Sequence, residues 1–154
     1  MMMKKFNSSD DILDFAIRAE QDAIDFYSKL YQTAENTNMK AAYKEFILEE
    51  QSHKEKLKKL KTEGKLSGIE IAKITDLKIS DYLPEKTPHE NMDYQESLII
   101  VMQREKAAYK LYSDLAEIAD NEALKKLFLV LAAEEAKHKL KFEIEYDDAV
   151  NLEN

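Results

Sequence analysis

The sequence predicts an all-α protein, a four-helix bundle in which a long crossover joins two helical hairpins. The 154 residues include only two glycines and two prolines, which leaves few turns and favours long helices. Apolar residues recur at the spacing of an amphipathic helix in four separate stretches. The second half also repeats the first at an offset of 85 residues, most clearly between residues 20–30 and 105–115. The whole chain, 1–154, is expected to form a single domain.

The first hairpin is predicted from two periodic stretches. The first helix should span about 9–36, with Ser8 or Ser9 as its N-cap and acidic residues in its first turn. A polar turn follows. The second helix should span about 38–63 and end at Gly64, since glycine readily adopts the backbone conformation that stops a helix.

The segment 64–92 differs in composition from the rest of the chain. It contains both glycines and both prolines, together with spaced apolar residues. A structureless loop of this length is unusual in a compact domain. We therefore expect a crossover that lies against the bundle and includes a short helical turn.

The second hairpin follows the crossover. Its first helix is predicted over about 93–120, where Asp93 and Glu96 resemble a capping box. Its second helix is predicted over about 122–146, and the polar tail that begins at Asp147 is expected to fray.

Composition excludes several classes of function. A formal net charge of −8 argues against binding nucleic acid or an anionic membrane surface. The absence of cysteine excludes disulfides, thiolate metal sites and a cysteine nucleophile. No apolar run approaches the ~20 residues that span a bilayer, and the N-terminus lacks the apolar core of a signal peptide. The expected compartment is the cytoplasm.

Two Glu-x-x-His motifs and two isolated glutamates hold matching places in the two halves. The six residues are Glu20, Glu50, His53, Glu105, Glu135 and His138. The spacing within each motif places its glutamate and histidine on one helix face. In an antiparallel hairpin, the residue numbers of any two residues that face each other add up to the same total. Each isolated glutamate should therefore lie level with the motif of its partner helix.

The surroundings of these glutamates indicate burial. Glu20 and Glu105 lie within apolar stripes, whereas Glu117 is flanked by polar residues and is expected to be solvated. Four buried carboxylates close together would repel, so either most are protonated or cations compensate them. Two divalent ions would balance four carboxylates, and two neutral imidazoles would add nitrogen ligands. This ligand set suits iron, and could also hold manganese or zinc.

Each motif alone is a weak signal, because most helical glutamates are solvated and Glu-x-x-His arises often by chance. The shared offset and the two symmetric turns make the combination specific. Tyr27 and Tyr112, two turns beyond the isolated glutamates, could donate hydrogen bonds to ligating carboxylates or could simply pack in the core. Glu49 and Glu134 point about 100° away from the ligand face. His89 is expected to be exposed.

At these residues the chain resembles the rubrerythrin family of the ferritin-like superfamily, over roughly 10–145. The resemblance implies a ferritin-like bundle that holds two iron ions. It implies that Glu50 and Glu135 bridge the irons. It further implies that Glu20 and Glu105 are terminal ligands and that each histidine binds one iron.

The chain departs from that family in two respects. Rubrerythrins proper carry a rubredoxin domain with cysteine-bound iron, whereas this chain has no cysteine. Electrons are therefore expected from an external donor, such as a rubredoxin-like protein. Rubrerythrins also have an extra glutamate one turn after the isolated glutamate of the third helix, where this chain has Ala108. In the family, that extra ligand supports a redox-linked shift of one iron. Because Ala108 replaces it, the resemblance does not extend to peroxidase chemistry by that route.

The leading hypothesis is a di-iron oxidoreductase that reduces hydrogen peroxide or dioxygen with electrons from Fe(II), and that forms a homodimer. Two alternatives remain open. One is iron binding or storage without much turnover, which requires a large assembly. The other is a structural bundle that holds zinc or manganese inertly.

Overall fold

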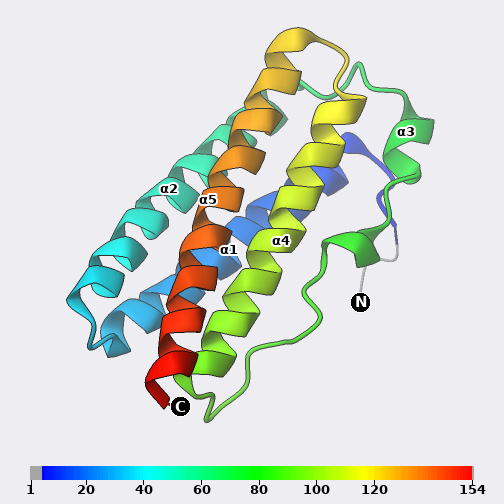
Figure 1. The fold of residues 1–154 in the computed structure, drawn as a ribbon. Helices are drawn as coiled ribbons and strands as arrows, with labels where there is room; N and C mark the ends of the chain where they lie inside the picture. Colours follow the sequence, from blue (N-terminus) through cyan, green and yellow to red (C-terminus); the bar gives the residue numbers. More distant parts are fainter. Residues whose placement is uncertain (1–4, 154) are drawn as a thin grey trace. The chain divides into compact units, whose positions relative to one another are not determined.

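In the computed structural model, residues 5–153 are described, and all their regular structure is helical (Figure 1). The long helices are α1 (Ser9–Thr33), α2 (Thr37–Thr62), α4 (Tyr94–Ile118) and α5 (Glu122–Glu153). Two short elements lie in the crossover, α3 (Ile71–Thr75) and the 3-10 helix η1 (Ile79–Tyr82). The predicted all-α class and the expected helical turn in the crossover are confirmed. The chain forms two compact units, Phe6–Asp76 and a second that begins at Leu77.

In the first unit, α1 and α2 pack side by side as an antiparallel hairpin (Figure 1). Ser8 caps α1, where its hydroxyl accepts a hydrogen bond from the Asp11 amide at 3.2 Å. Asn36 caps α2 by accepting from the Met39 amide at 3.2 Å. The buried face of this hairpin includes Ile12, Leu13, Ala16, Tyr27, Met39, Tyr43 and Leu57.

Gly64 ends α2 as the sequence predicts. Its φ of +62° lies in the left-handed region, where a side chain would be strained. The Gly64 amide donates to the Lys61 carbonyl at 3.1 Å, and the Lys65 amide donates to the Leu60 carbonyl at 3.0 Å. This pair of bonds is the Schellman arrangement, which satisfies carbonyls that the helix end leaves open. The chain then continues into α3, which packs against α1.

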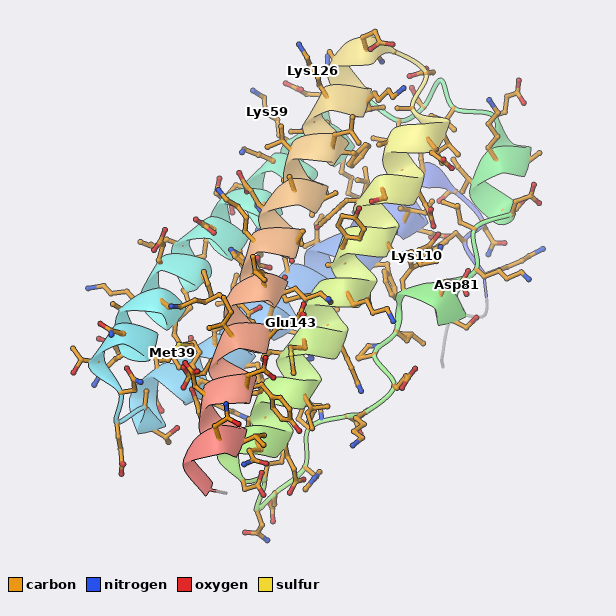
Figure 2. The ribbon with its side chains drawn as sticks, in the orientation of Figure 1. Met39, Lys59, Asp81, Lys110, Lys126 and Glu143 are labelled. Atoms are coloured by element: carbon orange, nitrogen blue, oxygen red, sulfur yellow. The ribbon has the colours of Figure 1, made fainter. Side chains whose placement is uncertain are left out.

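In the second unit, α4 and α5 form the other antiparallel hairpin, and η1 packs against α4. Asp93 caps α4 by accepting from the Glu96 amide at 2.8 Å, as predicted. Figure 2 labels Asp81 in η1 and Lys110 in the neighbouring part of α4. His89 precedes α4 and is exposed as expected, with its Nε2 3.0 Å from a carboxylate oxygen of Glu96.

One expectation about the second hairpin is wrong. The chain does not fray at Asp147, because α5 continues to Glu153. No glycine or proline interrupts this stretch, and the Lys139 ammonium contacts the Glu143 carboxylate at 2.6 Å one turn away. The Tyr94 hydroxyl of α4 also donates to Glu145 at 3.1 Å, which supports the later half of α5. None of the helices described is both long and apolar enough to cross a membrane.

Candidate metal centre

The first unit brings together three of the predicted residues. Glu20 comes from α1, and Glu50 and His53 come from α2. Their exposed fractions are 2%, 1% and 0%. The His53 Nδ1 lies 3.7 Å from a Glu20 carboxylate oxygen and 3.8 Å from a Glu50 carboxylate oxygen. One ligand atom from each residue lies within 4.8 Å of the others, so this N-terminal triad has the spacing of a metal site.

The local fold explains why these three side chains meet. The turn between Thr33 and Thr37 lies midway between Glu20 and His53 along the chain, so the two residues face each other across the hairpin. Glu50 precedes His53 by three residues and shares its helix face. The structure therefore brings Glu20 level with Glu50 and His53, as the residue numbering of the hairpin predicts.

The electrostatics of the N-terminal triad favour a bound cation. Burial raises the pKa of the Glu20 carboxyl well above its usual range, and the neighbouring Glu50 carboxylate raises it further. The nearby His53 acts in the opposite direction but is the smaller influence. A divalent ion would relieve both the desolvation and the repulsion, because opposite charge favours the ionised carboxylate.

The second unit repeats this arrangement in a C-terminal triad. Glu105 comes from α4, and Glu135 and His138 come from α5. All three side chains are 1% exposed. The His138 Nδ1 lies 3.7 Å from a Glu105 carboxylate oxygen, the same separation as between the equivalent residues of the first unit. One ligand atom from each of the three residues again falls within 4.8 Å of the others.

Glu105 provides a direct test of whether a cation fits. Both of its carboxylate oxygens are buried, and neither accepts a hydrogen bond from any described residue. The 3.7 Å separation from His138 is longer than the ~3 Å of a hydrogen bond. A metal with bonds of about 2.1 Å could nevertheless contact both atoms. The donor set and its spacing thus fit a divalent metal ion.

The two predicted tyrosines are buried, each 1% exposed. The Tyr27 ring lies 6.2 Å from the Phe46 ring, and the Tyr112 ring is stacked 6.4 Å from that of Phe128. These contacts support the core-packing alternative. Hydrogen bonds from the tyrosines to the ligating carboxylates stay a prediction.

The remaining candidates lie where the sequence places them. Glu117 is exposed on α4, and Ala108 occupies the position one turn after Glu105. Within residues 5–153, the acidic and histidine side chains that gather at metal-binding spacing are the six predicted ones. The structure adds no ligand candidate that sequence reasoning missed.

Comparisons with known proteins agree with this site. A family model described as Rubrerythrin matches residues 11–146. Among curated proteins, none matches. The solved structure of a hypothetical protein from Pyrococcus furiosus is similar over 92% of this chain and 89% of that chain, with a TM-score of 0.70. Its 24% sequence identity supports the fold alone. Because the family model spans most of the chain, the protein belongs to the rubrerythrin family, whose fold is a ferritin-like helical bundle.

Proposed function

We propose that the six residues hold two iron ions and that the protein is a di-iron carboxylate oxidoreductase that reduces hydrogen peroxide or dioxygen. The observation that carries the proposal is the pair of buried Glu, Glu and His triads, one in each helical hairpin. Membership of the rubrerythrin family supports iron as the metal. Glu20, Glu50 and His53 of one hairpin and Glu105, Glu135 and His138 of the other would hold the ions.

The chain's own side chains supply charge balance and a dry environment. Four carboxylates offset the four positive charges of two divalent ions, and two imidazoles add neutral donors. When bound, two ferrous ions would supply two electrons to an oxidant. Because all six side chains are buried, bulk water would be kept from bound metals, and the attraction between carboxylate and cation would be stronger than in water.

The source of replacement electrons is a further part of the proposal. The chain has no cysteine and so cannot build a rubredoxin-type iron site of its own. We therefore assign re-reduction to an external protein such as a rubredoxin-like donor, acting in the cytoplasm. Ala108, which lacks a carboxylate, favours a site whose ligands stay fixed during turnover.

Anaerobic loading with Fe(II), followed by separate additions of hydrogen peroxide and dioxygen, tests the proposal. We expect each peroxide molecule to oxidise two Fe(II), with two protons consumed and two water molecules formed. The wild type should oxidise both ions, and a Glu50→Ala, Glu135→Ala variant should not. Loaded protein whose iron stays ferrous after both oxidants would contradict the redox function while leaving metal binding intact.

A further inference from the structure

One face of α4 carries positive charge and an exposed aromatic ring beside the C-terminal triad. At 100° and 1.5 Å per residue, Lys106, Tyr109 and Lys110 fall within about 100° of the helix circumference and about 6 Å of its length. Both lysines are exposed, and Tyr109 is 46% exposed. Lys110 is labelled on α4 in Figure 2. Lys106 directly follows the buried Glu105, and Tyr109 lies one turn beyond it.

The internal repeat shows that a hairpin of this kind does not require such a face. Gln21, Ile24 and Asp25 of α1 stand at the three equivalent positions, 85 residues earlier. Ile24 is only 7% exposed, in contrast to Tyr109. The exposed charges of residues 99–113 are all positive, whereas three of the four exposed charges in the equivalent residues 14–28 are negative. The two hairpins therefore present opposite charge beside their triads.

The second hairpin also has two lysines where the first has a hydrogen bond between its helices. In the first hairpin the Lys54 ammonium donates to the side-chain oxygen of Gln21. The 85-residue offset places Lys139 and Lys106 at these two positions. Like charges repel, and the Lys139 ammonium contacts the Glu143 carboxylate at 2.6 Å instead. A pair of lysines that forgoes the hydrogen bond of its counterpart points to a role in binding negative charge.

We propose that this basic face, made of Lys106, Tyr109, Lys110 and Lys139, is the docking surface for the electron donor, and that the donor is a small acidic protein. The inference rests on the proposed function, in which an external protein supplies electrons. Aromatic side chains are enriched at the centres of interfaces, and charges at their rims steer association. The net charge of −8 repels an acidic partner elsewhere, so a local basic face would set its orientation. A donor bound here would lie within about one helical turn of Glu105.

Binding of a purified acidic rubredoxin, measured by calorimetry on the full chain with Zn(II) added, tests this surface. We expect binding that weakens as salt concentration rises. Lys106→Gln combined with Lys139→Gln should raise the dissociation constant about tenfold, because two charge contacts are lost. Lys125→Gln combined with Lys126→Gln is the matched control, since it removes the same charge from exposed sites at the start of α5. The control should change the constant by less than about twofold, because those charges are screened from the basic face. Equal effects of the two pairs, or no binding to the wild type, would overturn the proposal.

Thermal unfolding distinguishes a binding role of these residues from a structural one. Lys106→Gln recreates the lysine and glutamine pair of the first hairpin, so its melting temperature should equal or exceed that of the wild type. Tyr109→Ser should weaken binding of the rubredoxin, whereas Tyr94→Ser, at a tyrosine of α4 that is 38% exposed, should not. A Lys106→Gln chain with a lower melting temperature would assign this lysine to the fold and contradict the proposal.

The same experiment separates failure of the docking surface from failure of the proposed function. Zn(II) is redox-inert, so the binding measurement does not depend on oxidation of bound iron. A chain that binds rubredoxin through the basic face, yet keeps its iron ferrous after both oxidants, would contradict the proposed function and leave the docking surface standing. A chain that oxidises its iron, yet binds rubredoxin equally well without Lys106 and Lys139, would contradict the docking surface alone.

Discussion

Glu105 shows at the scale of a single residue how a cation would fit the buried cluster. Its carboxylate is 1% exposed, and neither oxygen accepts a hydrogen bond from the described residues. Burial of a charged group without compensation costs several kcal/mol. A bound metal ion would offset this cost for the ionised carboxylate.

Glu105→Gln should therefore separate stability from metal binding. The substitution removes a buried ionisable group whose oxygens accept no hydrogen bond from the described residues, so the metal-free variant should be more stable to urea by about 1–3 kcal/mol. Its melting temperature should rise less on addition of Fe(II), because one ligand is lost. Glu117→Gln on the exposed face of the same helix is the control and should change neither quantity. A destabilised metal-free Glu105→Gln protein with a full metal response would contradict this role.

At this scale the sequence was informative because the ligand geometry follows from helix period and turn position. Glu20 meets His53 because the turn lies midway between them, and Glu50 joins them because three residues separate it from His53. The side-chain environment of Tyr27 and Tyr112 was not predictable in the same way. Ring packing against Phe46 and Phe128 depends on rotamers and on neighbours in the partner helix.

The short helix η1 is joined to α4 by a part-buried hydrogen bond. The Tyr82 hydroxyl donates to the Asp114 carboxylate at 2.8 Å, and the Lys110 ammonium contacts the same carboxylate at 3.2 Å. Tyr82 is 4% exposed. This contact fixes the end of the crossover against the second hairpin.

Tyr82→Phe should lower the free energy of unfolding by about 1–2 kcal/mol, because Asp114 loses a donor at a site partly shielded from water. Urea denaturation measures this change. Tyr94→Phe is the matched control, since the Tyr94 hydroxyl donates to Glu145 at an exposed position and should contribute less than about 0.5 kcal/mol. Equal effects of the two substitutions would contradict the account of η1.

The same contact gives a pH dependence. Burial and the Asp114 carboxylate raise the pKa of Tyr82 above its usual value. Above pH ~10 the unfolded chain therefore loses this proton while the folded chain keeps it, and stability falls as pH rises. Tyr82→Phe lacks this contribution. The stability difference between wild type and variant should thus shrink between pH 9 and pH 10.5 in urea titrations, whereas a constant difference would contradict the assignment.

The elements also show where sequence reasoning succeeds and where it stops. Ser8, Gly64 and Asp93 act as predicted, because caps depend on local chemistry. The end of α5 was missed, since a polar composition alone does not distinguish a frayed tail from a helix supported by Tyr94 of a neighbouring helix. The positions of α3 and η1 in the crossover were also beyond prediction, because they depend on contacts with α1 and α4.

The chain as a whole is a repeat whose halves share a buried triad and differ on an exposed helix face. Each hairpin retains a Glu, Glu and His triad on its buried face. Their exposed faces differ, since Lys44, Glu55 and Lys59 of α2 stand at the positions of Leu129, Leu140 and Ile144 in α5, although Leu48 of α2 is also exposed and apolar. We infer that the two halves share one task, with each contributing three side chains to the candidate metal centre.

Equilibrium binding of Fe(II) under anaerobic conditions tests the central claim most directly. We expect the wild type to bind two Fe(II) per chain and to show a higher melting temperature when loaded. The Glu50→Ala, Glu135→Ala variant should bind almost none and lose the metal-dependent rise in melting temperature, while Glu45→Ala, an exposed change on α2, should match the wild type. Two Fe(II) bound to the double variant, with the wild-type rise in melting temperature, would show that the metals bind elsewhere.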